Sequence, residues 1–419
     1  MTASTDDSMF DVLVVGAGFA GLATAARLRR SPRVRFALLE QGDGVGSFWK
    51  GTYDRVRLHS PDHDLPRDGG LRAAYPMLLG REQLIAYFND YATHHDLAPH
   101  LRLGTRVERV GAQPGAHPWR VETSRGVLHA RYLAVATSVN RVPVETRFDG
   151  AEGFAGRVLH SASYRNPTSF RGRSVLVVGS GNSGAEIAVD LLEGGARAVA
   201  MWVRAPRHFI PLKPTLALYR TFRALGQMRE AKLAATHALT RGTAAFDREV
   251  RMRDLPMKLL SADLSAFGVR KPEVGPIHGM LYHHRIPVMD VGAIARIRDR
   301  SLRVIDGNVR AIRGLSADGV VFSDGEERFD DVVLATGYEP GLERFIDARE
   351  LFEEAHGCRH WPVTDGRCRS RVHPSVFFPG FDVTPLGGVS LGRWGWEVGE
   401  RIVAELEGRA PDGSVSTGS

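Results

Sequence analysis

The sequence DVLVVGAGFAGLATAARLRR, residues 11–30, decides the fold of the N-terminal half of the chain. The run DVLVV is mostly apolar and β-branched, as in a buried strand of a parallel sheet. A glycine-rich turn follows at once, and LATAARLRR has a helical composition. A second apolar run at residues 34–39 ends in Glu40. The order strand, turn, helix, strand predicts a βαβ unit with an acid at the tip of its second strand.

The turn of this unit matches G-x-G-x-x-G at Gly16, Gly18 and Gly21, in the context that dinucleotide-binding turns require. The first glycine permits a tight turn, the second lets the backbone approach a pyrophosphate, and the third lets helix and strand pack closely. The helix N-terminus then offers free N–H groups to the phosphates. Glu40 is placed to accept hydrogen bonds from a ribose hydroxyl, and its carboxylate would repel a 2′-phosphate. The sequence therefore predicts FAD or NAD, rather than NADP, at this first site.

The same order recurs from Ser174, where SVLVV precedes the turn GSGNSG at 179–184, a helical stretch and a second strand. This second strand ends in Arg204 and has no acid at its tip. A guanidinium at that place can pair bidentately with a 2′-phosphate, which favours NADPH. A surface ion pair is the plainer alternative for Arg204.

The repeat predicts an α/β protein with two Rossmann-like dinucleotide-binding domains, in which the NADPH domain is inserted in the FAD domain. The run VVLATGY at 332–338 is expected to be a central strand that returns to the first domain's sheet. Residues 215–264 are expected to form a helical cap, with an amphipathic helix lying on a membrane as the alternative. The predicted boundaries are 9–168 and 326–410 for the FAD domain, 169–325 for the NADPH domain with its helical segment, and 411–419 for a disordered tail.

Composition excludes several classes of function. The 419 residues carry a formal net charge of +7, but the basic residues are mostly scattered arginines, and we find no nucleic-acid-binding motif. Two cysteines, Cys358 and Cys368, cannot build a secreted disulfide scaffold, so a cytoplasmic location is expected. No apolar run approaches the ~20 residues that span a bilayer, and the first residues are not expected to be a signal peptide. No metal-ligand cluster is predicted, and a homodimer is allowed.

Two dinucleotide sites in one chain imply hydride transfer between two cofactors, most simply from NADPH to a flavin. A disulfide reductase would need two closely spaced cysteines, whereas Cys358 and Cys368 are ten residues apart. Reaction of the reduced flavin with O2 is the best interpretation. An NADPH-dependent reductase or oxidase, which passes electrons to a partner or to oxygen, stays open as the alternative.

Residues 154–164 have the spacing F-x-G-x-x-x-H-x-x-x-Y, and with several other segments, Gly275-Pro276 among them, they resemble the flavin-containing monooxygenase family, the class B flavoprotein monooxygenases. This spacing matches the family signature, and it stands just before the second glycine-rich turn. LATGY at 334–338 and ATSVN at 136–140 resemble the family's two linking segments, with Ser138 in place of a glycine. Residues 46–59 and 285–292 are similar to the YUCCA-type branch, whose members are indole-3-pyruvate monooxygenases. The resemblance covers nearly the whole chain.

The resemblance implies that FAD and NADPH bind, and that a C4a-(hydro)peroxyflavin oxygenates a small-molecule substrate with O2. Heteroatom oxidation and oxidative decarboxylation of an aryl 2-oxo acid are the two reaction types it allows. The candidate catalytic residues are His59, which takes the place of an asparagine in other branches, and Asn140. His160 is interpreted as a structural loop histidine rather than a proton donor. The residues expected to contact the cofactors are Gly16, Gly18, Phe19, Ala20, Gly21, Glu40, Gln41, Ser47, Trp49, His59, Thr137, Gly179, Ser180, Gly181, Asn182, Ser183, Arg204, Thr336 and Gly337.

Overall fold

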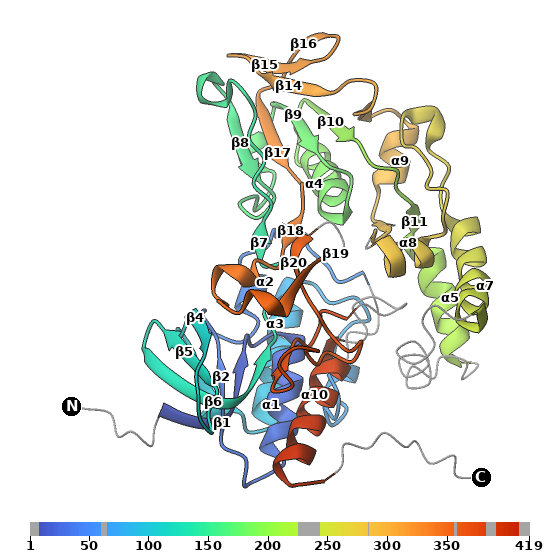
Figure 1. Ribbon diagram of the computed structural model, residues 1–419. Coiled ribbons are helices and arrows are strands. Elements are labelled where there is room, and N and C mark those ends of the chain that lie inside the picture. Colours follow the sequence, from blue (N-terminus) through green and yellow to red (C-terminus); the bar gives the residue numbers. More distant parts are fainter. Residues whose placement is uncertain are drawn as a thin grey trace.

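Two separate sheets organise the molecule, one above the other in the view of Figure 1. In each sheet one strand is followed by a glycine-rich turn and a helix, as the sequence repeat predicts. The computed structural model describes residues 8–59, 65–224, 244–283, 285–355, 358–382 and 391–409. The predicted disordered tail at 411–419 lies outside these ranges.

The first sheet is built around β1 (Met9–Val15), which pairs in parallel with β2 (Phe36–Leu39) and with β6 (Gly126–Val135). Both faces of β1 are covered, which explains why its residues 12–15 are continuously apolar and buried. The sheet runs in the order β3-β2-β1-β6-β5-β4, and its β4–β5–β6 part is antiparallel. The remaining strands are β3 (Leu101–Arg102), β4 (Val107–Ala112), β5 (Trp119–Thr123) and β21 (Val376–Phe377), which pairs with β6.

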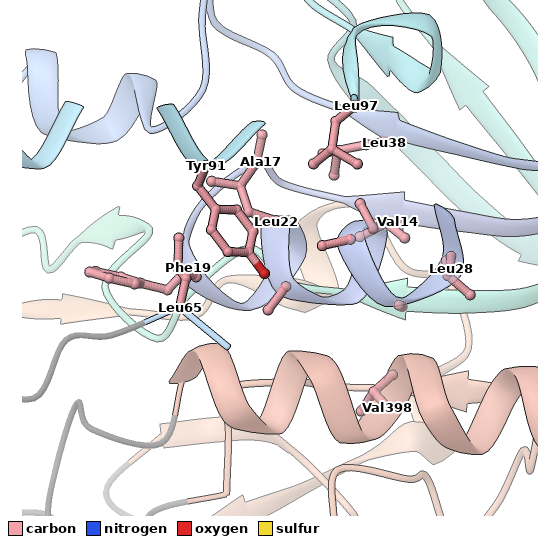
Figure 2. Close-up of a cluster of buried hydrophobic side chains, with 14 of the residues drawn as sticks. Val14, Ala17, Phe19, Leu22, Leu28, Leu38, Leu65, Tyr91, Leu97 and Val398 are labelled. Carbon is pink, nitrogen blue, oxygen red and sulfur yellow. The ribbon is translucent and has the colours of Figure 1, made fainter. Parts of the chain in front are cut away.

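One face of this sheet is covered by α1 (Phe19–Arg29), α3 (Arg81–His94) and α10 (Leu391–Leu406). Figure 2 shows α10 running alongside α1, with Val398 directed at the cluster that α1 and β1 share. The helices approach closely because α10 presents a glycine: a Cβ on Gly395 would lie 2.0 Å from the Ala20 carbonyl oxygen. The N-terminal part of α1, which follows the first glycine-rich turn, therefore packs directly against α10.

The second sheet is parallel throughout, in the order β13-β10-β9-β17-β8. Strand β17 (Asp331–Leu334), which lies between β9 and β8, contains the start of the VVLATGY run, so the expectation that this run returns to the first sheet is wrong. The buried Asp331 carboxylate accepts hydrogen bonds from Arg157 and Arg173, which fixes β17 between its neighbours. The other strands are β8 (Arg157–His160), β9 (Ser174–Val178), β10 (Ala198–Val203) and β13 (Leu302–Asp306).

Strand pairing thus places β8 and β17 in the second sheet, although both lie outside the predicted range 169–325. The domain limits themselves stay a prediction. The chain passes between the sheets twice, and the two connections pair with each other as β7 (Val142–Pro143) and β18 (Tyr338–Glu339). The two linking segments predicted from the sequence, residues 136–140 and 334–338, lie next to this pair of strands.

Further helices and small sheets surround the second sheet (Figure 1). Helices occupy most of the described part of the segment 215–264, as predicted, up to residue 260, and no helix in the described ranges is long and apolar enough to cross a bilayer. The elements are α4 (Asn182–Glu193), α5 (Leu212–Ala224), α7 (Ala244–Leu260), α8 (Pro276–His283), α9 (Ala293–Arg298), β11 (Phe209–Pro211), β12 (Val288–Asp290), β14 (Ile312–Leu315), β15 (Gly319–Phe322) and β16 (Gly325–Arg328). The first domain adds α2 (Ser47–Lys50), β19 (Phe352–Ala355) and β20 (Cys358–Pro362).

Candidate functional site

The first glycine-rich turn connects β1 to α1 and leaves an open concave face. A Cβ on Gly21 would lie 1.8 Å from the Gly16 carbonyl oxygen, so only glycine permits this closure of the turn. A Cβ on Gly18, by contrast, would meet no protein atom within 4 Å. Gly18 is also the N-cap of α1 and provides no side-chain cap, so the first N–H groups of the helix face that open space. The geometry fits a pyrophosphate bound at a helix N-terminus.

The second turn, between β9 and α4, repeats this geometry. A Cβ on Gly184 would lie 2.2 Å from the Gly179 carbonyl oxygen, whereas one on Gly181 would meet nothing within 4 Å. Gly181 is the N-cap of α4 and again provides no side-chain cap. Ser180 is buried and Ser183 is half-buried in the same turn. Both turns therefore leave open space beside a helix N-terminus. We call the turn at Gly16–Gly21 the first cradle and the turn at Gly179–Gly184 the second cradle.

Glu40 lies at the tip of β2, where the sequence places it, and is 7% exposed. Its carboxylate accepts hydrogen bonds from the N–H groups of Ala17 at 3.0 Å and Gly42 at 2.8 Å, and from the Ser47 hydroxyl at 2.7 Å. These bonds fasten the first turn to the loop after β2 and to α2. Oε1 accepts the bonds from Gly42 and Ser47, whereas Oε2 accepts only the one from Ala17 and has a lone pair left, so a ribose contact at Oε2 stays a prediction that the geometry permits.

Other predicted contacts of the first site lie on three elements around the turn. Phe19 and Ala20 are buried in the first turn of α1, Trp49 is half-buried on α2, and Gln41 is exposed beyond Glu40. Thr137 follows β6, and its hydroxyl oxygen is buried without a hydrogen-bond partner among the described residues. An orphaned buried hydroxyl beside the first turn is the observation expected where a polar ligand completes the site.

Two residues predicted for the second site, Asn182 and Arg204, form hydrogen bonds within the protein. The Asn182 amide accepts from the Met289 N–H at 2.8 Å and donates to the Pro287 carbonyl at 3.2 Å, so this side chain holds β12 against α4. Arg204 is exposed just beyond β10, and its carbonyl oxygen accepts from Arg270 and Asn308. These bonds anchor the backbone of Arg204 just beyond the tip of β10, and its contact with a 2′-phosphate stays a prediction.

The linking segments are tied together by hydrogen bonds near the crossing of the chain. The Thr336 hydroxyl donates to the Val144 carbonyl at 3.1 Å, and His160 Nε2 lies 3.1 Å from the Gly337 carbonyl. The other ring nitrogen of His160 accepts from the Ala162 N–H, and burial lowers the pKa of this histidine. Both nitrogens are therefore engaged by backbone with a neutral ring, which favours the structural interpretation of His160. Asn140 is exposed in the same linker, and its catalytic role stays a prediction.

His59 lies in the loop after α2 and contacts helix α4 of the second sheet's βαβ unit. Its Nε2 lies 2.7 Å from a carboxylate oxygen of Glu186, a residue of α4 that is 2% exposed. The other oxygen of Glu186 accepts from the Tyr53 hydroxyl. Burial, and next the Glu186 charge, raise the pKa of Tyr53 well above its ordinary value, so the phenol keeps its proton and donates. The candidate catalytic histidine is thus bonded to the helix of the second cradle.

Helix α10 carries two tryptophans and an arginine near its N-terminus. Trp394 is 3% exposed and Trp396 packs against the core cluster of the first domain, so both contribute to packing. Arg393 pairs with Glu397 one turn further along the helix at 3.2 Å, as a surface ion pair would. Residues 383–390, which precede α10, lie outside the described part of the chain.

A family model described as pyridine nucleotide-disulphide oxidoreductase matches residues 13–213, which contain both glycine-rich turns. The indole-3-pyruvate monooxygenase YUCCA1 of Oryza sativa subsp. japonica is 35% identical over 347 residues, which cover 81% of this chain and 80% of the relative. The chain belongs to the flavin-containing monooxygenase family. A second relative of this monooxygenase, the indole-3-pyruvate monooxygenase YUCCA6 of Arabidopsis thaliana, is 30% identical over 396 residues, 90% of this chain and 87% of its own.

As a member of this family the protein is a flavin-dependent monooxygenase, and FAD and NADP(H) are its cofactors. Its fold matches solved structures along almost its full length. A flavin-containing monooxygenase from Stenotrophomonas maltophilia has a TM-score of 0.65 at 21% identity, covering 95% of this chain and 99% of the other. The cyclohexanone monooxygenase from Rhodococcus sp. Phi1 bound to NADP+ has a TM-score of 0.68 at 18% identity, covering 95% and 85%. The predicted architecture of two Rossmann-like domains is confirmed.

Sequence reasoning missed Glu186 and Tyr53. A signal for Glu186 was present, because it is an acid in the helix after the second turn, inside a run of residues, 184–189, that are all buried. An unpaired charge is rarely buried in such a helix, so it called for a partner elsewhere in this monooxygenase. Nothing in the sequence indicated which segment supplies that partner.

Proposed function

We propose that this monooxygenase holds FAD at the Gly16–Gly21 turn and NADPH at the Gly179–Gly184 turn, and transfers one atom of O2 to a small organic substrate. The observation that carries the proposal is the pair of open cradles with different residues at their strand tips. A buried carboxylate, Glu40, stands at the first tip and an exposed guanidinium, Arg204, at the second. The carboxylate disfavours a 2′-phosphate and the guanidinium favours one.

The first substrate class to test is the aryl 2-oxo acids, because the curated relatives described above are named indole-3-pyruvate monooxygenases. In that reaction the 2-oxo acid loses CO2 and becomes the carboxylic acid one carbon shorter, while the second oxygen atom leaves as water. Oxygenation of an amine or sulfide is the other reaction type that the resemblance allows. A homodimer and a cytoplasmic location stay predictions from the sequence.

The chain's own residues bind, orient and shield in this scheme. When bound, the flavin supplies the oxygen-activating chemistry and NADPH the electrons, so few acids or bases are needed from the protein. Trp49 and Phe19 form part of the apolar wall beside the first cradle, where exclusion of water protects reactive species. His59 stays the candidate for a contact with substrate or oxygen, with Nε2 held by Glu186.

A coupled assay tests this function against the reductase or oxidase alternative. NADPH oxidation in air is followed with indole-3-pyruvate, an amine and a sulfide in turn, and both the organic product and free hydrogen peroxide are quantified. We expect product in nearly equal amount to the NADPH consumed with one substrate class, and little peroxide. NADPH oxidation matched by peroxide with every substrate would instead favour the oxidase.

Replacement of Arg204 by glutamate should reverse the nucleotide preference. The substituted carboxylate would repel the 2′-phosphate, and loss of a charge-assisted contact of about 1.5–3 kcal/mol corresponds to roughly a 10- to 150-fold higher KM for NADPH. The KM for NADH should change little. Arg328→Glu, an exposed arginine on the distal strand β16, is the matched control. Equal NADPH kinetics in the Arg204 variant and the control would refute the assignment of the second site.

A further inference from the structure

Residues 47–59 touch both cradles of the enzyme; we call them the bridging segment. At one end the Ser47 hydroxyl donates to Glu40 at 2.7 Å, within the first cradle. At the other end Tyr53 and His59 bond to Glu186, on the helix whose N-terminus forms the second cradle. Inside the segment, the Thr52 hydroxyl and N–H both bond to the Trp49 carbonyl, which joins α2 to the loop that follows.

The face of α4 that meets the bridging segment carries three acids at helical spacing, Glu186, Asp190 and Glu193. Their surroundings differ. Glu193 is 45% exposed in its side chain and pairs with Arg55, while Asp190 accepts from Tyr164 at 2.7 Å. Only Glu186 of these three is 2% exposed and bonded to two side chains of the first domain. The three acids therefore provide one buried contact and a surface contact that can serve as its control.

A buried carboxylate is a poor way to gain stability, because its desolvation offsets most of the attraction to its partners. Such a group is well suited to fix one geometry, since each oxygen requires a donor in a definite direction. Glu186 is only five residues after Gly181, so it lies close to the second cradle. If Tyr53 and His59 shifted relative to Glu186 by even a bond length, the bridging segment would move relative to that cradle. Hydride transfer tolerates little misplacement of its two rings.

From these contacts we infer that Glu186 is a positioning residue: through Tyr53 and His59 it holds the bridging segment against α4 and so fixes the spacing of the two cradles. This inference rests on the proposed placement of FAD and NADPH. It assigns Glu186 no contact with either cofactor or with the substrate. It also gives His59 a structural partner that is independent of any role in the chemistry.

Glu186→Gln is the direct test, because glutamine keeps the size of the side chain and removes the charge and one acceptor oxygen. Glu193→Gln, which breaks the exposed pair with Arg55 on the same helix, is the matched control. Amide hydrogen exchange of residues 51–59 is measured on both FAD-loaded variants, with the dissociation constant of NADP+ and the anaerobic rate of flavin reduction at saturating NADPH. We expect faster exchange and about 10- to 100-fold slower reduction only in Glu186→Gln, with FAD content near that of the wild type.

The outcomes separate positioning from simple stability. If Glu186→Gln lowers the melting temperature but its folded, FAD-loaded fraction is reduced at the wild-type rate, the residue is structural and the inference fails. If the variant does not fold, Tyr53→Phe and His59→Leu each remove one of the two hydrogen bonds to Glu186 and must both slow reduction, or the inference fails. A wild-type flavin that NADPH does not reduce would overturn the proposed function itself, not the role of Glu186 alone.

Discussion

Gly18→Leu should give a folded protein that is colourless after purification. The backbone at Gly18 has φ −93° and ψ −163°, which any residue adopts, and a Cβ there would touch no protein atom within 4 Å. The leucine therefore fits the protein and occupies the space that we assign to the pyrophosphate. Loss of two charge-assisted N–H bonds at ~1.5–3 kcal/mol each would weaken FAD binding by roughly 10²- to 10⁴-fold.

The measurement is the ratio of flavin to protein absorbance, with circular dichroism to confirm the fold. Gly153→Leu is the control, because Gly153 also has an open Cβ position but lies away from both turns, in the 3-10 turn at 151–153. The control should stay yellow. A Gly18→Leu protein that retains a full complement of FAD would show that the first turn does not approach the pyrophosphate.

Gly181→Leu should give the opposite phenotype, a yellow protein that NADPH can no longer reduce efficiently. Gly181 has φ −72° and ψ −177° and an equally open Cβ position, so the substitution again fits the protein. The same loss of phosphate contacts should raise the dissociation constant of NADPH by roughly 10²- to 10⁴-fold. FAD content should stay that of the wild type.

Titration of the oxidised enzyme with NADP+ and anaerobic reduction by increasing NADPH give the two affinities. The pair of leucine variants serves as mutual control, since each alters one cradle of the same shape. An unchanged affinity for NADP+ in Gly181→Leu, or loss of FAD from that variant alone, would contradict the assignment of the second turn.

The glycine-rich turns were predictable because their requirements are local. Gly16 to Gly21 and Gly179 to Gly184 follow a buried strand and precede a helix within a few residues, so sequence alone specifies turn, helix N-terminus and open face. The acid or arginine at the next strand tip lies in the same βαβ unit. These features gave both the architecture and the choice of cofactors, and the family resemblance added the link to oxygen chemistry.

The placement of β17 was not predictable in the same way. After Asp331 its residues, Val332, Val333 and Leu334, are all apolar, which suits the interior of either sheet. Pairing with β8 and β9 is decided by contacts such as that of Asp331 with Arg157, across a long sequence separation. The apolar composition of an interior strand indicates that both of its faces are buried, but it does not indicate which strands pair with it.

The contact of His59 with Glu186 was missed for a related reason. The two residues are 127 positions apart: Glu186 lies in the second βαβ unit, whereas His59 lies in a loop that follows the first. The sequence marks Glu186 as an acid in an apolar helix and His59 as a polar residue in a family segment, but only the folded chain brings them together. Side-chain partners between the two substructures depend on how these units pack, which periodicity does not encode.

The central claim, two different dinucleotides facing each other across the two cradles, is tested most directly by rapid anaerobic mixing of the purified wild-type enzyme with NADPH or with NADH. The measured signal is the absorbance of the oxidised flavin. We predict that NADPH bleaches the flavin fully, and much faster than NADH at equal concentration. A protein that carries no flavin, or a flavin that stays oxidised in the presence of NADPH, would contradict the account.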